Sequence, residues 1–238
     1  MSDSANQVVV VTGASGNLGR AVSRAFHEAG AQLVLVGRKG IGVSDVLACG
    51  QDTSGHMVLA PVDVTDADAA HRVAMEAVER FGRIDVLVNT VGGYRAGTPV
   101  HETPVATLDF LFNLNVRSMF LMCQAVIPTM LTQQAGKIIN ISAGGGLKGS
   151  KGNAAYSASK SAVIRVTESL AAELKASGIN VNCVLPGIID TPQNRAAMPK
   201  ADYSRWVTTA SIAETILFLA SDGARDVVGA AVPVFGRG

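Results

Sequence analysis

Tyr156 and Lys160 are the two residues whose types and spacing most directly suggest chemistry in this chain of 238 residues. They stand four positions apart at the start of a stretch with helical periodicity, so both side chains would lie on one face of a helix. A tyrosine hydroxyl, with a reference pKa of about 10, is a poor acid or base near neutral pH. A neighbouring ammonium favours the phenolate, so the pair predicts proton transfer to or from a substrate oxygen. Taken alone, the same spacing is also typical of an ordinary helix surface.

A glycine-rich turn follows the first apolar run and leads into a predicted helix. It reads Thr12-Gly13-Ala14-Ser15-Gly16-Asn17-Leu18-Gly19. Glycine lets the backbone approach a pyrophosphate, and a helix N-terminus offers free N–H groups and a favourable dipole. Because the turn stands between the first strand and the first helix, it predicts a dinucleotide phosphate site rather than a plain turn. The residues predicted to bind the cofactor there are Gly13, Ser15, Gly16, Asn17, Leu18 and Gly19.

The end of the second apolar run bears on the choice of cofactor. A carboxylate at this point would accept hydrogen bonds from the ribose 2′-hydroxyl of NAD. The chain instead has Gly37 and Arg38, with Lys39 beside them. Cationic side chains pair with a 2′-phosphate, so Arg38 favours NADP, with NAD possible and a solvated charged turn as the alternative.

Short apolar runs alternate with longer stretches of helical period, which predicts the elements that position these residues. The runs cover residues 8–11, 33–36, 57–62, 84–88, 137–141, 179–184 and 230–234, and the helical stretches cover 18–29, 67–81, 107–134, 154–177 and 212–220. The runs are apolar on successive residues, as in strands covered on both faces. The alternation predicts the α/β class: a single-domain Rossmann fold over residues 1–238, with a doubly wound parallel sheet of about seven strands.

Composition excludes several other classes of protein. The formal net charge is +1 and basic residues form no run, so nucleic-acid binding is not expected. No uninterrupted apolar stretch approaches the roughly 18 residues of a membrane span, and the first strand begins too early for a signal peptide, so a soluble cytoplasmic protein is predicted. The three cysteines and four histidines show no metal-ligand spacing, so no metal site is predicted.

The glycine turn, the Tyr156-x-x-x-Lys160 pair and the chain length together resemble the short-chain dehydrogenase/reductase family, over essentially the whole chain. Further motifs of the family follow in order along the chain. Asp63-Val64 resembles the family's adenine-contacting pair, and Asn89-Thr90-Val91-Gly92 resembles its turn after the fourth strand. Asn115 matches the asparagine of the family's proton relay, and Pro186-Gly187 with Thr191 resembles the loop that holds the nicotinamide carboxamide. The resemblance implies an NAD(P)-dependent oxidoreductase with Tyr156 as acid or base, Lys160 orienting the ribose, and Asn115 relaying protons. It also implies a homodimer or homotetramer, formed through the two longest helices.

Two positions depart from the family pattern. The middle glycine of the phosphate turn is replaced by Asn17, which tolerates a left-handed backbone better than most residues. The usual catalytic serine, 13 residues before the tyrosine, is replaced by Ala143. Ser142 is adjacent, but neighbouring residues of a strand point to opposite faces, so Ser142 is a doubtful substitute.

A C-terminal segment points to the substrate. Residues 190–206 resemble the corresponding stretch of dihydropteridine reductases, members of the family that also lack the serine but prefer NADH. Ligands of open parallel sheets bind beyond the carboxyl ends of the strands, which places a substrate loop at about residues 188–210. Tyr94, Ala143, Met198 and Trp206 are the predicted substrate contacts, with Tyr203 nearby, and they suit a flat, small-molecule substrate. Alternatively, the aromatic residues only pack the loop, or Arg95 and Arg195 bind an acidic substrate.

The leading prediction is hydride transfer to or from a carbonyl, an alcohol or a conjugated acceptor of quinonoid or pteridine-like type. The alternatives are a dinucleotide-binding regulator with little or no turnover, which Ala143 makes conceivable, and a scaffold that uses the same fold.

Overall fold

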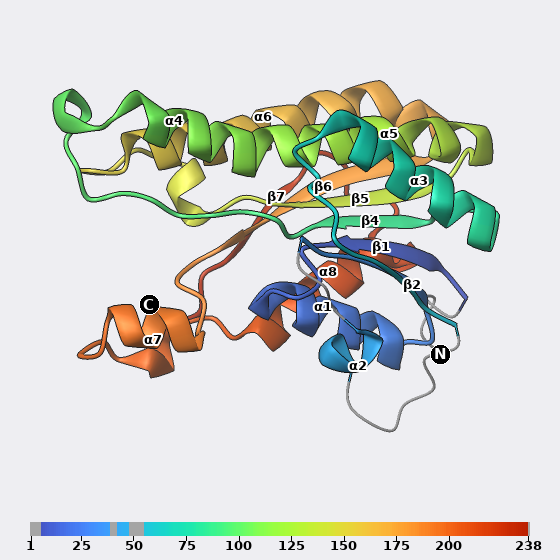
Figure 1. The fold of residues 1–238 in the computed structure, drawn as a ribbon, viewed down its shortest axis with the longest axis horizontal. Helices are drawn as coiled ribbons and strands as arrows, with labels where there is room; N and C mark the ends of the chain where they lie inside the picture. Colours follow the sequence, from blue (N-terminus) through green and yellow to red (C-terminus); the bar gives the residue numbers. More distant parts are fainter. Residues whose placement is uncertain (1–5, 39–41, 48–54, 238) are drawn as a thin grey trace.

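Seven parallel strands form one sheet in the computed structural model, which describes residues 6–38, 42–47 and 55–237 (Figure 1). The strands are β1 (Val8–Thr12), β2 (Gln32–Val36), β3 (Met57–Leu59), β4 (Val86–Asn89), β5 (Gly136–Ile141), β6 (Ile179–Pro186) and β7 (Ala231–Val234). Their order is β3-β2-β1-β4-β5-β6-β7. The predicted single-domain Rossmann fold is confirmed. The order reverses direction between β1 and β4, and the crevice at such a switch point is where ligands bind in this type of sheet.

Helices cover both faces of the sheet. They are α1 (Asn17–Glu28), α2 (Val43–Val46), α3 (Ala67–Phe81), α4 (Val105–Phe112), α5 (Ser118–Gln133), α6 (Ala154–Leu174), α7 (Pro192–Ala197) and α8 (Thr209–Ala220). Helices α3 to α6 lie on one face, and α1, α2 and α8 lie on the other (Figure 1). The five predicted helical stretches are present, whereas the short α2 and α7 were not predicted, since they have too few residues to show a period.

The apolar runs form strands because both faces of the sheet are buried. In β1, Val8 and Val10 belong to the hydrophobic core under α3, α5 and α6, while Val9 and Val11 belong to the core under α1 and α8. Side chains alternate across a strand, so a strand covered on both faces is apolar at every position. Fully burying each valine contributes about 1.5–3 kcal/mol relative to exposure.

The predicted helix at 107–134 is continuous but not uniform. A π-helical segment, Asn113–Arg117, joins α4 to α5. An 18-residue stretch within the run Val105–Gln133 has a mean hydropathy of 1.4, and the run is long enough to cross a membrane by length and composition alone. Its side chains Met119, Met122 and Val126 are buried in the core against the sheet. This packing is that of a core helix in an α/β domain.

Candidate active site

The phosphate turn is built from glycines that let the chain fold back on itself. Gly13 has a φ of 66°, and its carbonyl accepts a hydrogen bond of 2.9 Å from the Gly16 N–H. A Cβ on Gly19 would collide with the Gly13 backbone, so a side chain at this position would force the turn and α1 apart. Gly16 is the N-cap of α1 and provides no side-chain cap. The first-turn N–H groups therefore keep the capacity to bind an anion, which fits a dinucleotide pyrophosphate.

Asn17 keeps the turn intact for a reason other than the predicted one. The only non-glycine residues with positive φ in the described part of the chain are Asn6 and Gln134, so Asn17 is not left-handed. It is the first residue of α1, and its side chain lies outside the turn. Its Nδ2 donates a 2.7 Å hydrogen bond to Oε1 of Gln193 in α7. The tolerance of asparagine for a left-handed backbone is therefore not used, because the helical conformation already begins at this residue.

A cavity of about 390 Å³ lies at the switch point, at the carboxyl ends of β1, β2 and β4. It is lined by Gly13, Ser15, Gly16, Val36, Gly37, Arg38, Val62, Asp63, Val64, Thr65, Thr90, Val91, Gly92, Phe110 and Leu114. The structure thus brings Gly13, Ser15 and Gly16 together with Arg38 and the Asp63-Val64 pair, which come from three separate loops. Lys39 lies outside the described residues.

Other predicted cofactor residues lie away from this cavity. Leu18 packs into the core beneath α1, and Asn89 is buried, with its Nδ2 donating to Oδ1 of Asn140 at 2.9 Å. Pro186 ends β6 and Gly187 follows it, and the Thr191 hydroxyl caps α7 by accepting from the Asn194 N–H at 3.2 Å. Asn89 therefore braces β4 against β5 in this structure.

Asp63 places a negative charge beside Arg38. The pKa of its carboxyl is lowered by hydrogen bonds from the Thr65 N–H and the Thr65 hydroxyl, at 3.0 and 2.8 Å, and by the charge of Arg38. The carboxylate is thus ionised at neutral pH and holds the Thr65 turn. Arg38 itself is exposed and is available to an anionic ligand.

Tyr156, Lys160 and Asn115 meet at the start of α6. Asn115 is locked to the Gly93 backbone: its Oδ1 accepts from the Gly93 N–H at 2.8 Å, and its Nδ2 donates to the Gly93 carbonyl at 3.1 Å. The Asn115 Nδ2 also donates to the Ser159 hydroxyl at 3.0 Å, which donates to the Tyr156 carbonyl at 2.8 Å. The π-helical segment thus links α4 and α5 to the tyrosine-bearing turn of α6, a use typical of such bulges at functional sites.

The pKa values of Tyr156 and Lys160 differ from what the sequence predicts. Burial, and then the nearby Tyr94, raise the pKa of Tyr156 to about 12. Burial lowers the pKa of Lys160 to about 8, and its Nζ donates to the Ile141 carbonyl at 3.0 Å. The expected lowering of the phenol pKa is therefore wrong for this arrangement, because the ammonium points to the end of β5. A neutral phenol at pH 7 is a proton donor, which suits reduction of a carbonyl.

Ser142 is held away from the tyrosine side of the loop. Its hydroxyl is buried and donates to the Lys160 carbonyl at 2.7 Å. A Cβ on Gly146 would lie 2.8 Å from this hydroxyl, so the glycine is what lets Ser142 take that position. Ala143 follows with an extended backbone and leads into a 3-10 helix, Gly144–Gly146. The sequence-based doubt about Ser142 agrees with this geometry.

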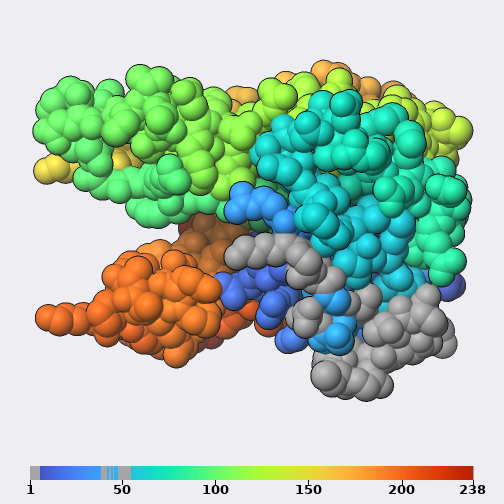
Figure 2. All heavy atoms as spheres, in the orientation of Figure 1, coloured from blue at the N-terminus to red at the C-terminus, as the bar shows by residue number. Residues whose placement is uncertain are grey.

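The predicted substrate residues lie on two sides of a hollow. Figure 2 shows the hollow between the chain around α4 and the chain around α7. Tyr94 is 65% exposed and meets Tyr156 edge-to-face, with ring centroids 4.8 Å apart. On the α7 side, Met198 is half-buried, and Trp206 packs on Tyr203 at 4.8 Å. The Tyr203 ring thus supports Trp206, as the loop-packing alternative expects, and Tyr94 borders the Tyr156 ring. Contact of these residues with a substrate stays a prediction.

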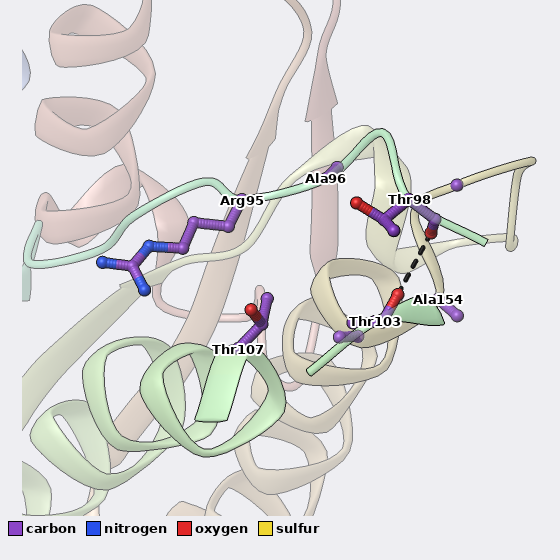
Figure 3. Close-up of a pocket in the computed structure, with 8 residues that line it drawn as sticks. Arg95, Ala96, Thr98, Thr103, Thr107 and Ala154 are labelled. Atoms are coloured by element: carbon purple, nitrogen blue, oxygen red, sulfur yellow. Dashed lines mark hydrogen bonds between the residues drawn. The ribbon is translucent and has the colours of Figure 1, made fainter. Parts of the chain in front are cut away.

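Both arginines considered for an acidic substrate have other partners. Arg195 forms two hydrogen bonds with Asp190, at 2.6 and 2.8 Å, and its guanidinium lies over the Tyr203 ring. Arg95 lies 3.5 Å from the Phe110 ring centroid. A pocket of about 100 Å³ beside Arg95 is lined by threonines, but the guanidinium extends away from Thr98 and Thr103 (Figure 3). These contacts disfavour the acidic-substrate alternative.

Five residues that line the 390 Å³ cavity belong to no predicted site motif: Val36, Val62, Thr65, Phe110 and Leu114. Phe110 and Leu114 are four positions apart and share one helical face, a signal that on its own is typical of core packing. Nothing in the sequence indicated the Asn17–Gln193 contact, since its partners are 176 residues apart.

Comparison with known proteins agrees with the geometry. The family model for short chain dehydrogenases matches residues 7–202. The chain is 34% identical to 2-(R)-hydroxypropyl-CoM dehydrogenase of Xanthobacter autotrophicus, covering 97% of this chain and 98% of that protein. It is 32% identical to the 3-oxoacyl-[acyl-carrier-protein] reductase FabG of Thermotoga maritima, over 97% and 96% of the two chains.

Solved structures show the same fold. ElxO with NADP bound is similar with a TM-score of 0.90 and 25% identity, over 97% of this chain and 98% of the other. Levodione reductase is similar with a TM-score of 0.90 and 29% identity, over 98% and 97% of the two chains. The chain therefore belongs to the short-chain dehydrogenase family. It is an oxidoreductase that uses a nicotinamide dinucleotide, and the regulator and scaffold alternatives give way.

Proposed function

We propose that this protein is an NADPH-dependent reductase of conjugated carbonyl acceptors, of quinonoid or pteridine-like type. One observation carries the proposal: the residue 13 before Tyr156 is Ala143, and the adjacent Ser142 hydroxyl is bonded to the Lys160 carbonyl. A hydroxyl at position 143 would stabilise charge developing on the substrate oxygen, and one such donor is worth about 2.7–4 kcal/mol. A substrate that spreads this charge over its own ring needs the donor less.

The preference for NADPH rests on Arg38. It is exposed at the rim of the cavity that contains the phosphate turn, where its guanidinium is free to pair with a 2′-phosphate. Asp63 nearby is hydrogen-bonded to Thr65, and among the described residues that line the cavity Arg38 is the cation. The NADP-bound structure of the similar ElxO is consistent with this choice.

The residues of the site have separate roles in the proposed reaction. The turn of Gly13, Ser15 and Gly16 would hold the pyrophosphate, and the bound nicotinamide supplies the hydride. Tyr156, neutral at pH 7, donates a proton to the substrate oxygen. Asn115 and Ser159 hold the tyrosine-bearing turn at a fixed distance from Gly93.

The remaining parts of the proposal concern the substrate loop and the assembly. Residues 188–210 form the substrate loop, which is similar to that of dihydropteridine reductases and includes Met198 and Trp206. Two-fold packing through α5 and α6 would give a homodimer or homotetramer in the cytoplasm. Phe120 on α5 is exposed, as an interface residue of the free chain would be.

The test compares two classes of acceptor with NADPH. The native protein should reduce a quinone or dihydropterin well and a plain ketone such as cyclohexanone poorly. Ala143→Ser should raise ketone reduction more than quinone reduction, and Ser142→Ala should leave the preference unchanged. Efficient reduction of cyclohexanone by the native protein that persists in Ser142→Ala would overturn the proposal.

A further inference from the structure

The segment at residues 235–237, directly after β7, lies against three parts of the active site. The Gly187 N–H donates to the Val234 carbonyl at 3.0 Å, which continues the β6–β7 pairing past the end of β6. Further on, the Arg237 N–H donates to the Arg205 carbonyl in the substrate loop at 3.2 Å. Between these anchors stands Phe235, a large apolar side chain that is 41% exposed.

Glycines make room for this segment on each side. A Cβ on Gly144 would lie 3.1 Å from Cε1 of Phe235, and a Cβ on Gly187 would lie 2.8 Å from the Phe235 carbonyl oxygen. Gly236 has a φ of 76°, and a Cβ there would lie 2.6 Å from the Arg205 carbonyl oxygen. The Phe235 ring therefore lies directly on the backbone of the loop that follows β5, in a position that side chains at these glycines would block.

That loop also carries the residues closest to the chemistry. The residue next to Gly144 is Gly145, where a Cβ would lie 3.4 Å from Cε1 of Tyr156. Ala143 directly precedes Gly144. The rings of Phe235 and Tyr156 thus lie against neighbouring residues, Gly144 and Gly145, of the short loop that Ala143 begins. An exposed aromatic ring in such a place has an open surface on which a flat apolar group can pack.

We propose that Phe235 contacts the substrate and selects acceptors that carry an aromatic or similarly flat apolar group next to the reacting carbonyl. The proposal deepens the function proposed above and rests on it for the position of the substrate carbonyl near Tyr156. Phe235 acts as a specificity-determining residue and takes no part in proton transfer.

The experiment measures binding without turnover. The protein is saturated with NADP⁺, which has no hydride to give, and is titrated by calorimetry with 1-phenyl-1,2-propanedione and with 2,3-butanedione. The two diketones share a conjugated pair of carbonyls and differ by a phenyl ring. Phe235→Ala should weaken binding of the phenyl diketone tenfold or more and change binding of butanedione less than twofold. Phe235→Leu, which keeps an apolar side chain in the fold, should show a smaller loss in the same direction.

Phe218→Ala is the matched control, because Phe218 is 52% exposed on α8 and outside the site. It should change neither affinity. A double-mutant cycle adds a second readout: Gly144→Ala should weaken phenyl diketone binding in the native background and much less in Phe235→Ala, since the new methyl acts by displacing the ring.

Three outcomes would overturn the proposal: no binding of the phenyl diketone to the native complex, an equal loss for both diketones, or a loss that accompanies dissociation of the protein on size exclusion. The last would mean that a second copy of the chain covers Phe235. If Phe235→Ala selectively loses phenyl diketone binding but the native enzyme with NADPH fails to reduce it, the reductase proposal falls while the role of Phe235 stands.

Discussion

At the scale of single residues, the site depends on two titratable groups that burial pushes in opposite directions. Burial makes Tyr156 harder to deprotonate and Lys160 easier to deprotonate, with pKa values of about 12 and about 8. Both shifts disfavour the charged form, as expected where water is excluded. At pH 7 Tyr156 is neutral and Lys160 is still largely charged, an arrangement that suits donation of a proton to a carbonyl oxygen.

Replacing the donor tests this role. Tyr156→Phe should keep the fold and cofactor binding, since the ring contact with Tyr94 remains. It should reduce turnover by about 100-fold or more, the usual contribution of a positioned general acid. Stopped-flow reduction of the best acceptor gives the rate, and NADPH fluorescence gives the affinity. Turnover at the native rate would exclude Tyr156 as the acid.

A second substitution addresses the cofactor. Arg38→Ala should reduce the preference for NADPH over NADH by about 1.5–3 kcal/mol, the value of one charge-assisted phosphate contact. Affinities for both cofactors, measured by fluorescence titration at one ionic strength, provide the comparison. NADH binding should be nearly unchanged in the variant, and equal affinities in the native protein would contradict the prediction.

At the scale of elements, the phosphate turn and the substrate loop are connected. The side chains of Asn17 and Gln193 join the first turn of α1 to the first turn of α7, at 2.7 Å. A bound dinucleotide would lie at the same turn, so this contact holds α7 over one end of its site. Since both side chains are exposed, the bond is weak enough to open during turnover.

Removing this contact should speed cofactor release. Gln193→Ala loses one neutral hydrogen bond worth about 0.5–1.5 kcal/mol, so NADPH dissociation should accelerate by about two- to tenfold. Asn17→Gly removes the same bond from the other side, and the double variant should add nothing further. Displacement of NADPH by excess NADP⁺ in a stopped-flow fluorimeter measures the rate. An unchanged rate in both single variants would show that the contact does not hold α7.

The sequence predicts elements better than it predicts contacts between them. The β1 run, with valines at every position from 8 to 11, is typical of a strand covered on both faces. The phosphate turn was found for the same local reason. Lys160, by contrast, points at the Ile141 carbonyl, and Phe235 lies on Gly144; these contacts depend on how β5, β7 and α6 meet in space. The hydrophobic periodicity of the sequence does not predict these contacts between elements, because the residues that meet lie far apart in the chain.

At the scale of the whole molecule, the buried Lys160 should cost stability. Lys160 is buried with a pKa of about 8, against 10.5 for the ordinary side chain. The unfolded chain therefore binds more protons than the folded one between these values, and stability from this group rises as the pH increases from about 8 to 10.5. Below pH 8 the full penalty applies, on the order of 3 kcal/mol at 1.36 kcal/mol per pKa unit. The bond from Nζ to the Ile141 carbonyl offsets part of it.

Lys160→Met should accordingly be more stable than the native protein at pH 7, by up to about 3 kcal/mol, and yet nearly inactive. Methionine matches the apolar length of lysine and removes the buried charge. The difference should shrink as the pH is raised through 8 toward 10.5, as the native lysine loses its proton. Urea unfolding at pH 7, 8.5 and 10 measures it, with Lys148→Met at a solvent-exposed lysine as the control. If Lys160→Met is less stable than the native protein at pH 7, the hydrogen bond from the ammonium to the Ile141 carbonyl stabilises the fold by more than burial of the charge destabilises it. The predicted loss of stability caused by Lys160 would then be wrong.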